Sequence, residues 1–337
     1  MEEKIIAAFL FSFSCSAVLL WATIFFFGKI PNRGEPGRLH KNVSRFGGIA
    51  LIAAFLFSIL FNPHLAWSPQ LAGLLSGSLI ILFFGAWDDF SPLHWGAQLG
   101  LQFILGIVLF VFGMRAWVIT NPFGDPLFLY PDSWFLPSFL IGIAFTFLIM
   151  NAVNWADGVD GLLGGVAVVA AIAIAVVSLR PEVNQPTVAI LSCIVAGIAL
   201  AFLFFNMPPA RILAGTTGAY FIGFAITALS LFAGAKIATT LLVLLVPALD
   251  ALYVFYARMR DHASPFRGGD GRHLHDKLRR MGFSERNIAL LYTALSALSA
   301  FVALSFQPSG KILFLGAFAI AFFFVLSRIE RLTPTRV

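Results

Sequence analysis

Two asparagines, two aspartates and four glycines are concentrated in residues 151–165, between two long apolar runs. Asn154, Asp157 and Asp160 recur at a spacing of three, so one helical turn would place their side chains on one side. Carboxylates beside long apolar segments are costly unless they bind something, and the glycines let a ligand approach the backbone closely. A polar turn capped by Asn and Asp would explain the same composition. Other parts of the chain must decide.

Two adjacent acids, Asp88 and Asp89, follow another apolar run. Neighbouring carboxylates repel each other, and a divalent cation or a shifted proton would relieve that repulsion. A helix N-cap would explain Asp88 but not Asp89. A further acid, Asp250, lies within an apolar run, where it would either contact another helix or line a site. These acids are candidates for metal binding or catalysis.

Two basic segments could contact phosphate. Residues 28–45 include Lys41 and Arg45, which would anchor the chain at anionic lipid or hold a phosphate group. Residues 264–284 include Arg272, His273 and His275. Two imidazoles and a carboxylate could bind zinc, but the interleaved Arg and Lys match an anionic diphosphate better.

The elements that must position these residues are apolar helices. Hydrophobic residues make up 59% of the 337 residues, charged residues 11%, and the mean hydropathy is +0.91. This composition predicts an all-α, polytopic membrane helical bundle. About 11 runs could span the membrane, namely 5–27, 46–61, 71–86, 97–112, 136–153, 162–179, 188–205, 218–232, 237–255, 288–306 and 312–326. We expect a single integral-membrane domain, 1–337, whose Cys15 and Cys193 act as small apolar side chains.

The charged loops predict an orientation. With 11 spans, 17 of the 22 Lys and Arg fall on one side, in loops at about 28–45, 87–96, 154–161, 206–217 and 256–287 and at the C-terminus. The positive-inside rule places that side in the cytoplasm and the N-terminus outside. The net charge of +6 therefore reflects topology and does not indicate nucleic-acid binding. Because the polar motifs share this face, an enzyme of the cytoplasmic leaflet is favoured over a transporter, which would carry polar groups at mid-membrane.

Four motifs in this order resemble the polyprenyl-phosphate N-acetylhexosamine-1-phosphate transferases, glycosyltransferase family 4. They are His-Lys…Arg-x-Gly-Gly at 40–48, Asp-Asp at 88–89, Asn-x-x-Asn-x-x-Asp-Gly-x-Asp-Gly-Leu at 151–162, and Asp-x-x-His-x-His at 270–275. The resemblance extends from residue 40 to about residue 304. The His-Leu-His-Asp wording is similar to members that use UDP-N-acetylglucosamine or related donors.

Two departures from the family pattern matter. The family usually has Gly-Asp-x-Gly in the loop before the eighth run, where the Asp is a magnesium ligand, and this chain has Thr216 at that position. A neutral hydroxyl could serve as a weaker ligand, because magnesium prefers hard oxygen donors. The prolines usual before Gly47-Gly48 are also absent.

The resemblance implies transfer of a HexNAc-1-phosphate, with GlcNAc-1-phosphate expected, from a UDP-sugar to undecaprenyl or another polyprenyl phosphate, releasing UMP at the bacterial inner membrane. Mg²⁺, with Mn²⁺ as an alternative, would be held by Asn154, Asp88 and Asp89, with Thr216 as a further candidate ligand. The implied catalytic residues are Asp88, Asp89, Asp157 and Asp160, and the implied substrate-binding residues are Lys41, Arg45, Asn151, Arg272, His273 and His275. A homodimer is a further expectation. The alternative is a catalytically silent relative that binds lipid phosphate or nucleotide sugar as a scaffold or regulator.

Overall fold

The computed structural model describes residues 1–27, 43–119, 121, 124, 127–129, 131–232, 237–264 and 270–332. Its helices are α1 (Glu2–Phe27), α2 (Gly47–Leu60), α3 (Pro69–Phe90), α4 (Trp95–Val111), α5 (Pro131–Ala156), α6 (Leu162–Ser178), α7 (Pro186–Asn206), α8 (Gly215–Leu231), α9 (Ile237–Val243), α10 (Leu245–Arg260), α11 (Leu274–Arg280), α12 (Glu285–Ser305) and α13 (Pro308–Leu332). Strands β1 (Val118–Ile119) and β2 (Leu127–Phe128) form one short antiparallel pair. The predicted all-α class is confirmed.

Every apolar run of the sequence is helical in the structure, and one run is broken. Six helices are long and apolar enough to cross a membrane, and a seventh span results if α9 and α10 count as one. These two helices meet at an angle of 80°. Pro247 is the third residue of α10, where its missing N–H costs no helical hydrogen bond. Four shorter apolar helices, α2, α4, α6 and α8, complete the set.

Local sequence signals determine several helix ends. Ser68 accepts a hydrogen bond from Leu71 N at the start of α3, and Ser284 accepts one from Asn287 N at the start of α12. Proline is the first residue of both α3 and α7, where its fixed φ suits a helix start. The residue before α6 is Gly161, with φ +82°, a left-handed conformation that glycine adopts without a steric penalty.

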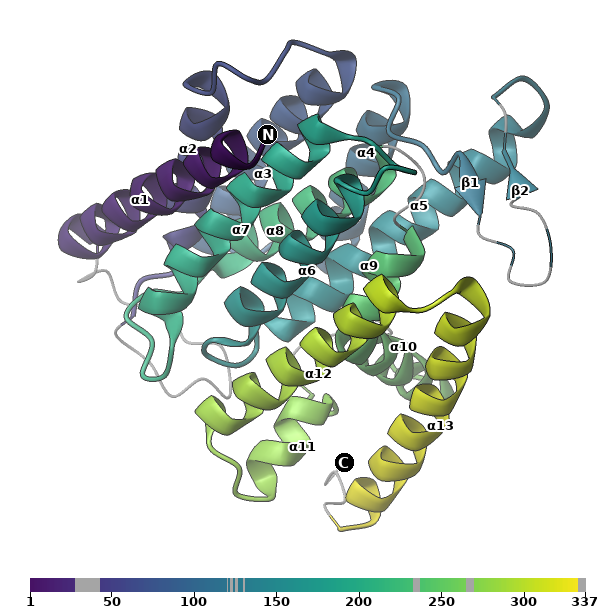
Figure 1. Ribbon diagram of the computed structural model, residues 1–337. Coiled ribbons are helices and arrows are strands. Elements are labelled where there is room, and N and C mark those ends of the chain that lie inside the picture. Colours follow the sequence, from purple (N-terminus) through teal and green to yellow (C-terminus); the bar gives the residue numbers. More distant parts are fainter. Residues whose placement is uncertain are drawn as a thin grey trace.

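The buried centre of the bundle is formed by α7 and α8. Every residue of α8 from Thr217 to Leu231 is buried. Helices α1 and α2 lie on one side of this pair, and α12 and α13 lie on the other side of the molecule (Figure 1). Helix α8 is therefore enclosed by the other helices of the bundle.

Large apolar side chains face outward from the peripheral helices. Phe25 is 68% exposed on α1, Phe83 is 75% exposed on α3 and Leu313 is 74% exposed on α13. Exposure of such large apolar side chains to water would be unfavourable, whereas contact with lipid would suit them. Between their ends, such helices satisfy their backbone polar groups within the helix, as a bilayer requires. The protein is a multi-pass membrane protein.

Candidate functional site

Asp89 is bound to the beginning of α8. Its carboxylate accepts hydrogen bonds from Thr216 N at 2.7 Å, Thr217 N at 3.1 Å and Thr217 Oγ1 at 2.6 Å. The Arg45 guanidinium lies 4.0 Å away. The first N–H groups of a helix have no partner within the helix, and the helix dipole favours a negative charge there. Asp89 therefore caps α8, although it is distant in sequence. We call Arg45, Asp88, Asp89, Thr216 and Thr217 the acid cluster.

Asp88 is buried and points to different donors. Its Oδ1 accepts from Leu93 N at 2.8 Å and from Gln98 Nε2 at 3.0 Å, and its Oδ2 accepts from Thr216 Oγ1 at 2.6 Å. Both acids belong to the last turn of α3. Hydrogen-bond donors from the protein thus offset the mutual repulsion that the sequence suggested a cation or a proton would relieve.

Glycines allow α2 and α8 to start almost in contact. A Cβ atom on Gly48 would lie 2.1 Å from Gly218 N, so only glycine fits. Gly47 N donates to Leu213 O at 3.1 Å, and Leu213 N donates to Ser44 O at 2.9 Å. The Arg-x-Gly-Gly motif at 45–48 therefore connects the chain before α2 to the segment before α8, which brings Arg45 beside Asp89. Lys41 lies outside the described residues.

The prediction that Asn154, Asp157 and Asp160 share one helical face is wrong. Helix α5 ends at Ala156, so only Asn154 is helical, and residues 157–161 form a turn. Buried Asp160 accepts a hydrogen bond from Ala210 N at 3.0 Å through Oδ2. Asp157 is also buried, whereas Asn154 is half-buried. Because the helix ends before Asp157, the three side chains do not share one helical face.

Asn206 connects this turn to the segment before α8. Its Oδ1 accepts from Gly161 N at 2.8 Å, and its Nδ2 donates to Ile212 O at 2.9 Å. The turn at 157–161, the segment 206–214 and the acid cluster are therefore held together at one end of the bundle. Asn206 was not among the predicted site residues.

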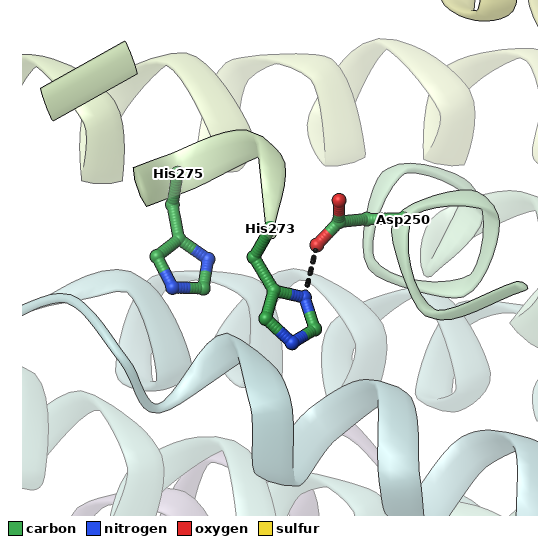
Figure 2. Close-up of side chains that lie close together, drawn as sticks. All are labelled: Asp250, His273 and His275. Carbon is green, nitrogen blue, oxygen red and sulfur yellow. Dashed lines mark hydrogen bonds and ion pairs between the residues drawn. The ribbon is translucent and has the colours of Figure 1, made fainter. Parts of the chain in front are cut away.

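His273 and Asp250 form a buried pair. His273 Nδ1 lies 2.8 Å from Asp250 Oδ2, and Leu274 N donates to Asp250 Oδ1 at 2.8 Å. Figure 2 shows the two imidazoles side by side, with Asp250 reaching His273 from α10. A ring nitrogen that faces a carboxylate carries a proton, so Nδ1 of His273 donates to Asp250. The sequence left open whether Asp250 contacts another helix or lines a site. In the structure it contacts and orients His273.

His275 packs against the turn at residues 157–161. The His273 and His275 rings are stacked, with centroids 5.2 Å apart, and His273 also lies 5.3 Å from the Trp155 ring. A Cβ on Gly158 would lie 2.5 Å from His275 Nε2, so glycine is required there. We call Trp155, Asp250, Arg258, Asp270, His273 and His275 the histidine cluster. Burial lowers the pKa of His275 to about 4, so the ring is neutral at pH 7.

Arg258 stabilises the segment that carries the histidines. Its guanidinium is fully buried and binds Asp270 through two hydrogen bonds, Nε to Oδ2 at 2.8 Å and Nη2 to Oδ1 at 2.9 Å. Burial alone would raise the pKa of Asp270, but the hydrogen bonds and charge of Arg258 outweigh it and hold that pKa below its ordinary value. Arg272 lies on the same segment and binds Asp261 at 2.7 Å.

Two donor sets could be considered for a metal. In the described part of the chain, ligand atoms of Asp250, His273 and His275 lie within 4.8 Å of one another. Both Asp250 oxygens already accept hydrogen bonds there, so the geometry matches an oriented imidazole better than a zinc site. Asp88 Oδ2 has a single donor, Thr216 Oγ1, and a carboxylate oxygen with a hydroxyl beside it is a hard-oxygen set that fits Mg²⁺. Asp89 fits less well, because both of its oxygens face α8.

Fold and site together define a class of protein. It is a multi-pass helical bundle whose acids and imidazoles converge at one end. The model of "Glycosyl transferase family 4" matches residues 71–234. The chain is 31% identical to a phospho-N-acetylmuramoyl-pentapeptide-transferase of Caldanaerobacter subterraneus subsp. tengcongensis, over 75% of this chain and 81% of that protein. Together these matches show that the chain belongs to this family.

Two further relatives carry similar names. The chain is 30% identical to a decaprenyl-phosphate N-acetylglucosaminephosphotransferase of Mycolicibacterium smegmatis, over 81% of this chain and 74% of the relative. It is 28% identical to a probable undecaprenyl-phosphate N-acetylglucosaminyl 1-phosphate transferase of Bacillus subtilis, over 74% and 70% of the two chains. The predicted family is confirmed.

Proposed function

We propose that this protein is a phosphoglycosyl transferase that moves N-acetylglucosamine 1-phosphate from a UDP-sugar to a polyprenyl phosphate and releases UMP. The single observation that carries the proposal is the convergence of the family motifs at one end of the bundle. Asp88 and Asp89 meet the start of α8, Gly161 is bound to Asn206, and His275 contacts Gly158. The named functions of the relatives support the same reaction.

The chemistry requires neutralisation more than covalent participation. A lipid phosphate oxygen forms a bond to the sugar-linked phosphorus, and the bond from that phosphorus to UMP breaks. A phosphate monoester has a second pKa of about 6, so the attacking phosphate is already largely ionised at pH 7. Positioning and electrostatic stabilisation of two polyanions therefore dominate. Asp88 contributes as a base only modestly.

The side chains of the site receive separate proposed roles. Asp88 faces the reacting phosphates, while Arg45 and Lys41 bind the lipid phosphate. Nε2 of His273 and the ring of His275, with Arg272, contact the diphosphate, and Asp157 and the half-buried Asn154 face the nucleotide. Asp89 and Asp160 act through the backbone of α8 and of the segment 206–214, because these are the groups that they bind. Asn151 positions other side chains.

Magnesium, with manganese as an alternative, is the proposed cofactor. Asp88, Thr216 and Asn154 would hold it, and it would supply positive charge to the diphosphate. Thr216→Asp tests this assignment. A carboxylate placed against Asp88 would repel it, so the thermal stability of the variant should depend on Mg²⁺ more strongly than that of the wild type. Equal responses would contradict a metal ligand at this position.

The proposed topology follows the charge distribution. If the four shorter apolar helices and the bent pair α9–α10 also span, the bundle has 11 spans, with the N-terminus outside and the C-terminus in the cytoplasm. The site then faces the cytoplasm of a bacterial plasma membrane, and the whole chain forms a single unit with its substrates at the inner leaflet. A homodimer stays a prediction.

The test is a donor screen with purified protein, polyprenyl phosphate and Mg²⁺. UDP-N-acetylglucosamine should give UMP and a lipid-linked sugar phosphate of the corresponding mass. The absence of both products with every UDP-HexNAc would contradict the transferase. Binding of UDP-sugar without turnover would favour the silent relative, which the replacement of the usual Asp by Thr216 supports. The screen also identifies the donor sugar.

A further inference from the structure

A continuous series of hydrogen bonds connects Asp88 to Asn151 through the interior. Gln98 Nε2 donates to Asp88 Oδ1 at 3.0 Å, and Tyr220 Oη donates to Gln98 Oε1 at 3.4 Å. Gln102 Nε2 donates to Tyr220 Oη at 3.2 Å, and Asn151 Nδ2 donates to Gln102 Oε1 at 2.7 Å. We call Gln98, Tyr220, Gln102 and Asn151 the amide chain.

The hydrogen bonds that link Asn151, Gln102, Tyr220 and Gln98 in sequence to Asp88 each have their donor on the side away from Asp88, while Gln102 Nε2 also donates back to Asn151 Oδ1 at 3.4 Å. A carboxylate only accepts hydrogen bonds, so Gln98 must turn its NH₂ group to Asp88 and its carbonyl to Tyr220. Tyr220 must then donate to that carbonyl, and its oxygen is left to accept from Gln102. This fixes each amide in turn, and hydrogen bonds aligned in one direction strengthen one another.

The hydrogen bonds of the amide chain are buried, so they are hard to replace by bonds to water. Gln102 and Tyr220 are each 1% exposed, so water cannot readily supply a lost bond. Gln98 and Gln102 lie one turn apart on α4 and therefore share a face. Asn151 fixes the far end, because its Nδ2 also donates to Phe147 O at 2.8 Å. The chain thus joins four helices, α3, α4, α5 and α8.

We infer that the amide chain positions Asp88 for phosphoglycosyl transfer by holding Oδ1 and leaving Oδ2 as the oxygen that faces the reactants. The inference rests on the proposed function. Oδ1 already has two donors, Leu93 N and Gln98 Nε2, whereas Oδ2 has one. Gln98, Tyr220 and Gln102 are therefore positioning residues, and Asn151 acts through them and not by binding substrate.

Tyr220→Phe tests the amide chain by removing one hydroxyl. Because the reacting geometry loosens, kcat should fall about tenfold, while KM for both substrates changes less than about twofold. The control is Thr227→Val on the same helix, which removes a buried hydroxyl that donates to Gly223 O. The control should keep the wild-type kcat. Equal kcat in both variants would overturn the inference.

A double-mutant cycle separates positioning from general packing. Gln98→Leu removes the direct contact with Asp88, so adding Tyr220→Phe should lower kcat no further, since both act through one contact. Additive losses would overturn the inference. If Tyr220→Phe does not fold, Gln102→Leu interrupts the chain at another link, and failure of both to fold would show an architectural role instead. An inactive wild type would contradict the proposed function, not the amide chain.

Discussion

The acid cluster and the histidine cluster hold carboxylates in different ways. Asp88 accepts hydrogen bonds from Leu93 N, Gln98 and the Thr216 hydroxyl. Asp89 accepts from the amides and a hydroxyl at the start of α8, with Arg45 at 4.0 Å. Asp270 instead faces the fully buried guanidinium of Arg258. The hydrogen-bond donors to Asp88 and Asp89 are neutral, whereas Asp270 forms an ion pair with Arg258 through two hydrogen bonds. Asp88, which accepts from Leu93 N, Gln98 and Thr216, is therefore the carboxylate that we expect to attract a cation.

Because of this difference, substitutions in the two clusters should affect different properties of the protein. Loss of the Asp270 carboxylate in the histidine cluster leaves the Arg258 guanidinium buried without the acid that it binds through two hydrogen bonds, which destabilises the fold. Loss of a charge in the acid cluster leaves neutral donors, which a neutral acceptor can still satisfy. The first region should respond to substitution mainly in stability, and the second mainly in activity.

The largest expected effect is that of Asp270→Ala. It leaves the Arg258 guanidinium buried without its carboxylate and should lower the free energy of unfolding by about 3–5 kcal/mol. Denaturant unfolding in detergent measures the change. The control is Asp261→Ala, which removes an exposed ion pair with Arg260 and Arg272 and should leave stability near that of the wild type. Similar losses in both would remove the distinction between the clusters.

Asp88→Asn should affect activity rather than stability. An asparagine keeps an oxygen for Leu93 N and Gln98, and its NH₂ can donate to Thr216, whose hydroxyl can accept. The charge that would hold Mg²⁺ at the reacting phosphates is lost, so kcat should fall about 10²-fold while the melting temperature changes little. Steady-state assays and thermal denaturation measure both quantities. A strongly destabilised variant would show that the acid cluster is structural in the same sense as Asp270.

Gly48→Ala tests the approach of α2 to α8 on which the acid cluster depends. The added Cβ would lie 2.1 Å from Gly218 N, and overpacking of this kind costs about 1–3 kcal/mol. Gly100→Ala on α4 is the matched control, because its Cβ would meet nothing within 4 Å. The control should be neutral or slightly stabilising. Equal stability of the two variants would argue against the close contact.

A dependence of stability on pH is expected in the histidine cluster. The folded-state pKa of His275, about 4, lies below the unfolded value of about 6.5. The unfolded chain therefore binds the additional proton, and the free energy of unfolding should fall as pH decreases from about 6.5 to about 4. His275→Gln should make this decrease shallower. An unchanged slope would show that His275 does not contribute to it.

The sequence predicted the helical class because a long apolar run has few alternatives in a bilayer. It also identified Asp88, Asp89 and the histidine pair, because charged groups beside such runs are rare. It did not predict α11 or the 80° break between α9 and α10. Both depend on contacts with other helices and not on local composition.

What the sequence alone determined is which residues are candidates for the chemistry and how they are grouped along the chain. Only the tertiary structure decided what each polar group binds. Asp89 caps a helix that begins more than a hundred residues later, Asp250 orients His273, and Gln98 and Tyr220 join Asp88 to Asn151. Such partners are separated in sequence and leave no periodic signal, because a hydrogen bond requires two atoms at about 3 Å, whatever their distance along the chain.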